Sequence, residues 1–149
     1  MSHPATHDDV NLILRLYELR REEKMREARQ WFASMFRPIS TTEEFNKMCP
    51  PGSGQNANFR MVTSYWEMVA SFVTSGVLNE ELFFQSGGEL LLTWEKIRNL
   101  APALREVRKN PRMYHNLETV ATRMAGYMQR EAPEAYDVFA EMVRNMARQ

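Results

Sequence analysis

Apolar residues recur along most of this chain at intervals of three and four, the spacing that gathers them on one face of an α-helix. The clearest example is the stretch 56–75, where the apolar arc covers more than half of the helix circumference. That arc comprises Phe59, Met61, Val62, Tyr65, Trp66, Met68, Val69, Phe72 and Val73. So wide an arc is typical of a helix inside a core, so the other elements are predicted to pack around residues 56–75.

The N-terminal part of the chain predicts one long helix, from Thr6 or Asp8 to about Phe36, ahead of Pro38. Its middle, residues 20–30, has the sequence RREEKMREARQ and is almost wholly charged, with apolar residues before and after it. Such a helix is expected to dock at its two ends and to stay solvated between them. It is predicted to lie across the central helix, as a bridge or as an oligomerisation arm.

Capping residues and helix breakers mark the remaining helices. The overlapping capping boxes Ser40/Glu43 and Thr41/Glu44 predict a helix that runs to about Met48. Gly76 is expected to end the central helix, and Asn79 to cap a short helical segment after it. Pro102 is expected to kink or restart a helix that ends near Lys109, and Pro133 to lie in the first turn of the second helix of a C-terminal hairpin. No segment alternates with period two. The predicted fold class is therefore all-α, an irregular single-domain bundle of about six or seven helices.

Length and composition agree with one helical domain over residues 1–149, with residues 1–7 as a flexible tail. Lysine plus arginine equals aspartate plus glutamate at 19 each, so no global field favours nucleic acid, and a nucleic-acid partner is not expected. The single cysteine, Cys49, excludes an internal disulfide and suits a reducing cytosol. The start lacks a secretory signal, and Val10–Leu19 is too short and too polar to span a bilayer. We expect a soluble cytoplasmic protein without a membrane span.

Opposite its apolar arc, the central helix carries small hydroxyl residues together with Arg60 and Glu67. One interpretation is a polar groove in which Arg60 anchors an anion, with Arg98 and Arg105 from the following basic segment. The alternative is a solvent-exposed face, or a buried network in which Glu67 meets an arginine of another helix, because a central helix often carries satisfied polar groups. The sequence leaves both open.

Residues 96–112 carry six basic residues against one acid, Glu106. Besides the two arginines of the candidate groove, the candidate basic patch comprises Lys96, Arg108, Lys109 and Arg112. Such a patch could bind nucleic acid, an acidic partner or a membrane surface. The favoured interpretation is that basic residues near a helix C-terminus stabilise the helix and that the acidic middle of the chain neutralises them.

No motif for catalysis, for a cofactor or for a metal occurs in the sequence. His3 and His7 are four residues apart, but Pro4 lies between them and no third ligand is nearby. The Glu-x-x-His motif of di-metal helical bundles is absent. We therefore expect no catalytic residue, cofactor or metal, and a protein that is not an enzyme.

The run YWEMVASFVTSGVLNEELF, followed by WEKIRNLAPALREVRKNPRMYHNLE, resembles the bacterial domain-of-unknown-function family 4760 over roughly residues 56–118. The resemblance implies that Glu67, Gly76, Trp94 and Arg105 serve as a polar contact, a turn and packing positions, and it implies no activity. Members of that family often carry a membrane helix ahead of this region. This chain departs from that pattern, which favours a cytosolic variant.

The leading functional prediction is a non-enzymatic interaction or regulatory module that binds a protein partner or a second copy of itself. The alternative prediction is a sensor of a small ligand or an anion that uses the polar groove. An exposed apolar strip would favour the first, whereas convergence of Arg60, Glu67 and the basic segment on one cavity would favour the second.

Overall fold

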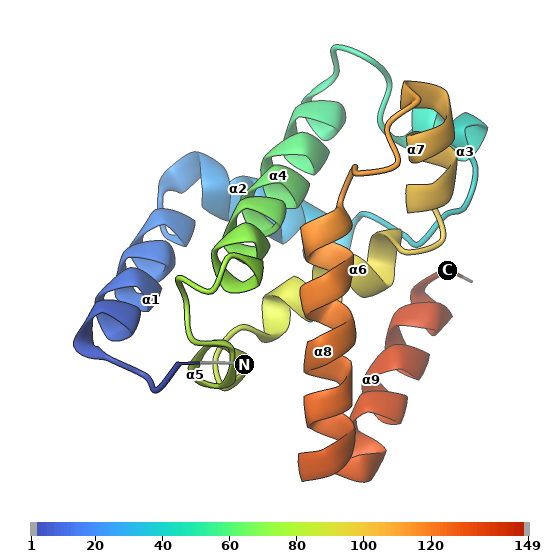
Figure 1. Ribbon diagram of the computed structural model, residues 1–149. Coiled ribbons are helices and arrows are strands. Elements are labelled where there is room, and N and C mark those ends of the chain that lie inside the picture. Colours follow the sequence, from blue (N-terminus) through green and yellow to red (C-terminus); the bar gives the residue numbers. More distant parts are fainter. Residues whose placement is uncertain (1–2, 148–149) are drawn as a thin grey trace.

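The computed structural model describes residues 3–147, which form nine α-helices and no strand (Figure 1). The helices are α1 (His7–Arg20), α2 (Glu23–Ser34), α3 (Thr42–Met48), α4 (Gly54–Thr74), α5 (Glu80–Phe84), α6 (Gly88–Ile97), α7 (Ala101–Arg108), α8 (His115–Glu131) and α9 (Pro133–Met146). The predicted all-α class is confirmed.

The central helix of the core is α4, as the width of its apolar arc predicts. It packs chiefly against α2 and α8, and α8 in turn packs against α6 and α9. Phe59, Val62, Trp66 and Val69 are each at most 2 % exposed, so the predicted face is the one that is buried. Gly76 has a φ of 83°, a left-handed conformation that glycine adopts without strain, and it ends the helix where predicted.

The predicted count of six or seven helices is too low, because two predicted helices are each divided in two. The first division lies at Arg21 and Glu22, between α1 and α2, where the sequence contains neither glycine nor proline. The second lies between Ile97 and Ala101, and Pro102 then occupies the first turn of α7, as a restart requires. The sequence indicated the second division and gave no sign of the first.

Residues 20–30 are not solvated throughout, contrary to the prediction for the charged segment. Met25 and Ala28 face the core and are buried. Arg29 donates from Nε to Oε1 of Glu89 (2.8 Å) and from Nη2 to Oε2 (2.9 Å), while Nη1 of Arg20 donates to Oε2 of the same carboxylate (2.8 Å). This cluster ties the corner between α1 and α2 to the first turn of α6.

Helix α1 lies at the outer edge of the molecule (Figure 1), and both apolar packing of Leu16 and polar contacts hold it there. Asp9 closes a capping box with Thr6 and accepts a hydrogen bond from the backbone N of Asn79 (2.8 Å). The hydroxyl of Tyr65 donates to the backbone O of Leu16 (2.6 Å). In the predicted tail, the carbonyl of His3 accepts from Nδ2 of Asn79, and residues 1–2 lie outside the described part of the chain.

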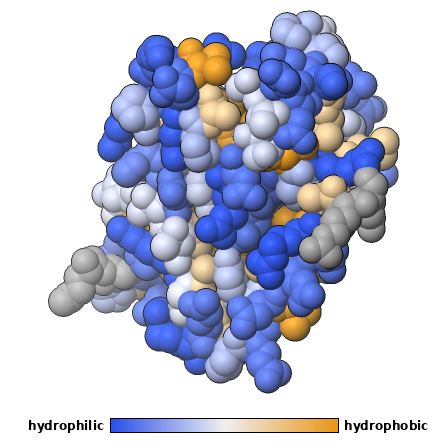
Figure 2. Space-filling model, turned by 90° about the vertical axis from the view of Figure 1, so that its right-hand side faces the viewer, coloured by the Kyte–Doolittle hydropathy of each residue, from blue (hydrophilic) through white to orange (hydrophobic). Residues whose placement is uncertain are grey.

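The C-terminal part is the predicted helical hairpin, in which α8 and α9 meet at Ala132 and Pro133 begins α9. Between residues 3 and 147, none of the helices combines the length and apolarity that crossing a membrane requires. On the side of the molecule where α7, α8 and α9 lie, the surface is mostly hydrophilic with isolated hydrophobic residues (Figure 2).

Candidate functional site

A shallow groove of about 480 Å³ runs along the face of α4 for which a polar groove was predicted. Arg60, Thr63, Ser64 and Glu67 form one wall, and the segment Arg112–Tyr114 forms the other. Arg60 is exposed and donates from Nε to Oδ1 of its helix neighbour Asn56 (2.9 Å). The groove is therefore basic at its edges, with one carboxylate on its wall.

The carboxylate of Glu67 already accepts two hydrogen bonds from within the protein. It accepts a hydrogen bond from the backbone N of Leu117 (2.8 Å) and one from Nδ2 of Asn116 (2.8 Å) at the start of α8. The residue at the N-cap of α8 is Tyr114, which has a φ of 60° and offers no capping side chain. Glu67 thus caps α8 from another helix, at the position where a helix N-terminus attracts an anion.

Replacing Glu67 by alanine is expected to lower the free energy of unfolding by about 1–2 kcal/mol, because the first turn of α8 loses its acceptor. Chemical denaturation measures the change. Glu81, exposed and without an ion pair among the described residues, is the control, and its alanine variant is expected to stay within about 0.5 kcal/mol of the wild type. Equal losses for the two variants would contradict the capping role.

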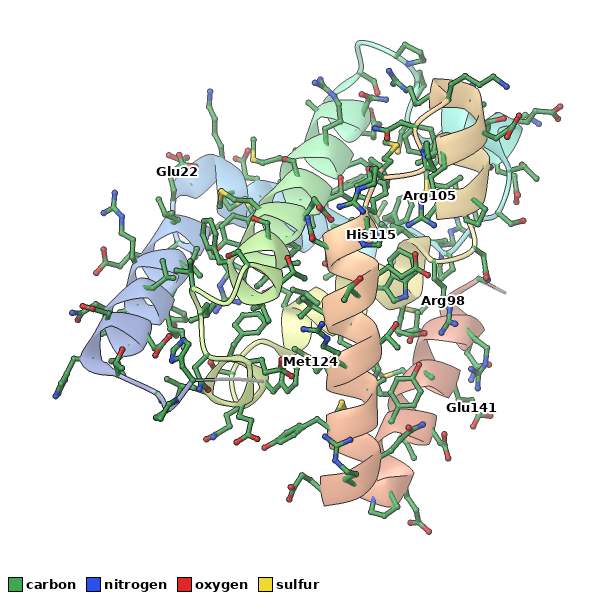
Figure 3. The ribbon with its side chains drawn as sticks, in the orientation of Figure 1. Glu22, Arg98, Arg105, His115, Met124 and Glu141 are labelled. Carbon is green, nitrogen blue, oxygen red and sulfur yellow. The ribbon has the colours of Figure 1, made fainter. Side chains whose placement is uncertain are left out.

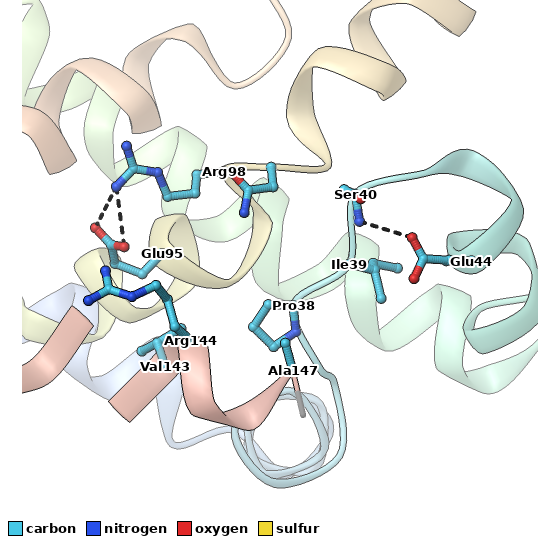
Figure 4. A pocket seen from close by; sticks show the side chains of 10 residues that line it. Pro38, Ile39, Ser40, Glu44, Glu95, Arg98, Val143, Arg144 and Ala147 are labelled. Atoms are coloured by element: carbon cyan, nitrogen blue, oxygen red, sulfur yellow. Dashed lines mark hydrogen bonds and ion pairs between the residues drawn. The ribbon is translucent and has the colours of Figure 1, made fainter. Parts of the chain in front are cut away.

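Arg98 and Arg105, labelled in Figure 3, are not among the residues that line the groove. Nη1 of Arg98 donates to the buried carboxylate of Glu95 (3.2 Å), on the wall of a separate cleft of about 580 Å³ between α6, α9 and the segment after α2 (Figure 4). Arg105 donates to the carbonyl of Met113 (2.8 Å) and to Oε1 of Glu118 (2.8 Å). The four candidate residues therefore do not converge on one cavity.

The candidate basic patch is divided in a similar way. Arg108, Lys109 and Arg112 are exposed at the end of α7 and just after it, and Nζ of Lys109 pairs with Oε1 of Glu106 (2.9 Å). Lys96 is only 1 % exposed and so does not contribute to any surface patch. Within the described residues, Arg108 and Arg112 are the two exposed members of the patch without an ion pair.

Lys96, on α6, instead caps the C-terminal end of helix α2. Its ammonium donates to three backbone carbonyls, those of Phe32 (2.6 Å), Ala33 (2.9 Å) and Phe36 (2.8 Å). The last carbonyls of a helix lack hydrogen-bond partners inside the helix. An ammonium group has three donors, so Lys96 can serve all three carbonyls at once. Burial lowers the pKa of Lys96 to about 8.

In the part of the chain that the structure describes, neither the thiol nor the metal-ligating side chains form a recognisable site. Cys49 is fully buried, and burial raises its pKa to about 11, which keeps the thiol protonated. Among residues 3–147, no three His, Cys, Asp or Glu side chains gather as metal ligands would.

An exposed apolar strip on the outer face of α1 is the clearest candidate for function. Val10 is 44 % exposed, Leu14 54 % and Tyr17 51 %. Residues four and three apart share one face of a helix, so the three side chains form a continuous strip. Leu16 and Asp9 on the opposite face are buried. We call Val10, Leu14 and Tyr17 the α1 strip.

The rest of the surface has no comparable feature among the described residues. The other exposed large hydrophobic side chains lie singly or, on α9, as one pair: Leu19, Met35, Met68, Val77, Val107, Val138 and Met142. Single exposed apolar residues are ordinary, whereas a contiguous strip is typical of an interaction surface. The spacing of the strip can be read from the sequence, but Ile13 and Leu16 form a second apolar face on the same helix. The sequence does not show which of these two faces is buried.

A family model described as Domain of unknown function (DUF4760) matches residues 5–124 of the chain. The chain belongs to this family. The match to DUF4760 is wider than the resemblance over residues 56–118 and includes α1, so the helix that carries the strip is part of the family region. No curated protein and no solved structure matches the chain.

Proposed function

We propose that this DUF4760 protein is a non-enzymatic interaction module of the cytoplasm that associates with a second copy of itself through the α1 strip. The observation that carries the proposal is the exposure of Val10, Leu14 and Tyr17 on one face of a peripheral helix. The cytoplasmic location rests on the single cysteine and its suitability for a reducing compartment.

A second copy fits the strip because the strip is self-complementary. In an antiparallel pair of α1 helices, Leu14 lies beside Leu14 of the other copy, and Val10 lies beside its Tyr17. The acidic first turn of α1, with Asp8, then lies near Arg21 at the basic end of the other helix. The dipoles of two antiparallel α1 helices oppose each other, and each chain has a net charge of zero, so neither term makes the two copies repel.

The association through the strip alone is expected to be weak. Two helices of 14 residues each that touch along one face bury less than the roughly 1,200 Å² of a standard interface. We therefore expect a dissociation constant on the order of 100 µM, which corresponds to about 5–6 kcal/mol. Such a dimer forms where the local concentration is high and dissociates readily.

Replacing Leu14 by glutamate tests the proposal. A charge at the centre of the strip meets its own copy across the interface, so the variant is expected to stay at 17.5 kDa in sedimentation equilibrium at concentrations where the wild type gains mass. The control is Val107→Glu, which changes a side chain that is 62 % exposed on α7. A wild type that sediments as Leu14→Glu does would contradict the proposal, as would equal loss of association in the control.

The anion sensor receives no support from the geometry. Glu67 occupies the start of α8, where a bound anion would lie, and among residues 3–147 Arg60 and Arg112 are the only basic residues that border the groove. We therefore do not extend the proposal to a ligand.

A further inference from the structure

The corner between α1 and α2 depends on the backbone of a single residue. Arg21 has φ −87° and ψ −8°, which is right-handed helical, whereas Glu22 has φ −59° and ψ 142°. Its φ is already helical, so rotation of ψ to about −42° would join the two helices. Glu22 lies exposed at this corner (Figure 3).

The local sequence favours the joined helix over the corner. Residues 19–24 have the sequence LRREEK, in which every residue is a strong helix former and no glycine or proline marks a turn. Glu22 serves as the N-cap of α2 and accepts from the backbone N of Met25 (3.0 Å), but glutamate is not among the residues preferred there. Local preference and the observed corner therefore disagree, a conflict typical of a hinge.

The corner is held by contacts that any copy of the chain can supply. We call residues 23–147, from the start of α2 onward, the body. Helix α1 is fixed to the body by hydrogen bonds from Asn79 to Asp9 and from Tyr65 to the carbonyl of Leu16, and by the pairing of Arg20 with Glu89. The side chain of Leu16 also packs in the core. None of these contacts requires α1 and the body to belong to one chain. The site on the body is also complementary in charge, since Glu89 offers a carboxylate to an arriving Arg20.

The packing of α1 on its own body is incomplete. Nε1 of Trp66 is buried without a hydrogen-bond partner, beside a void of about 20 Å³ that Ile13 and Tyr17 of α1 border together with Ser86. A buried donor without an acceptor reduces the free energy gained by docking α1. The defect lowers the free energy needed to undock α1, which exchange requires, and the same interface then forms on the other copy.

We infer that two copies of this chain exchange their α1 helices. In each copy Glu22 becomes helical, His7–Ser34 forms one helix about 42 Å long, and α1 docks on the body of the other copy. The bond from Nη1 of Arg29 to the carbonyl of Arg20 is lost, and backbone hydrogen bonds across the former corner replace it. The inference rests on the proposed self-association and assigns it a second, tighter form.

The first test compares two variants at the corner. Glu22→Ala removes the cap of α2 and favours the joined helix, so after incubation at about 1 mM and dilution the dimer fraction is expected to rise about fivefold over the wild type. Glu23→Ala removes the same charge from a residue already inside α2 and is expected to leave the fraction unchanged. Equal dimer fractions in the two variants would overturn the exchange.

The second test identifies which α1 lies on which body. Chains carrying Ile13→Cys are mixed with chains carrying Ser86→Cys, because these two residues border the same void, and Cys49 is buried and stays inert. A disulfide between the two kinds of chain supports exchange. Disulfides only between Leu14→Cys chains would overturn exchange and leave the contact between α1 strips intact. A disulfide between Ile13→Cys and Ser86→Cys chains, with none between Leu14→Cys chains, would overturn the strip contact and leave exchange intact.

Discussion

Replacement of Lys96 by methionine is expected to lower the free energy of unfolding by about 3 kcal/mol. Methionine keeps most of the aliphatic length of lysine but removes the ammonium that serves the carbonyls of Phe32, Ala33 and Phe36. Relief from burying a charge offsets part of the loss, which is why the value is below the sum of three hydrogen bonds. Urea denaturation followed by circular dichroism measures the change.

The control for this substitution is Lys47→Met. Lys47 also lies in the last turn of a helix, α3, but it is exposed. We expect the free energy of unfolding of this variant to stay within about 0.5 kcal/mol of the wild type. A Lys96→Met variant as stable as Lys47→Met would show that α2 does not need the ammonium at its end.

The difference between wild type and Lys96→Met is also expected to depend on pH. Burial lowers the pKa of Lys96 from 10.5 to about 8, so between these pH values the unfolded chain binds more protons at this residue than the folded chain does. The free energy of unfolding then rises with pH for the wild type relative to the variant. The stability gap widens from pH 8 to 10.5, and a gap that narrows would contradict the lowered pKa.

Replacement of Glu89 by alanine is expected to cost about 2–3 kcal/mol. The change leaves Arg20 and Arg29 beside each other without their shared carboxylate. The side chains of Arg20, Glu89 and Arg29 are 15 %, 24 % and 26 % exposed, so water compensates only partly for the lost pairing. Thermal and urea denaturation both report the loss.

Glu106→Ala is the matched control, because Glu106 also pairs with a basic residue. Its carboxylate and Nζ of Lys109 are 2.9 Å apart, but the two side chains are 79 % and 80 % exposed. An exposed pair contributes little, so this variant is expected to change the free energy of unfolding by less than about 0.5 kcal/mol. If both glutamates cost the same, burial is not what makes the Glu89 cluster important.

The sequence predicted the parts of the fold that depend on local signals. Asn79 caps α5, Gly76 ends α4 and Pro133 begins α9, because each of these residues has a conformational or capping preference that acts within a few positions. The apolar arc of α4 likewise identified the central helix.

The corner at Glu22 and the role of Lys96 were beyond sequence-based reasoning for a common reason. Both depend on partners about 60 residues away along the chain: Glu89 binds Arg29 at the corner, and Lys96 binds carbonyls at the end of α2. Charge patterning alone assigned residues 20–30 to solvent and Lys96 to a surface patch. The spacing of Met25, Ala28 and Phe32 was the one local sign that this segment has a buried face.

The candidate site shows the same limit. Helix α1 has apolar residues on both faces, and which face is covered depends on Tyr65, Asn79 and Glu89 of the body. The sequence therefore predicted a bridge or an oligomerisation arm without locating the α1 strip. It assigned Glu67 to a polar face without revealing that α8 uses its carboxylate as a cap.

The most direct test of the central claim, that α1 is where two copies of this chain meet, is a dilution series followed by amide chemical shifts in nuclear magnetic resonance. From about 10 µM to about 1 mM, the shifts are expected to change at Val10, Leu14, Tyr17 and their α1 neighbours and to stay constant on α7. Constant shifts throughout α1 over this range, or changes confined to α9, would contradict the claim.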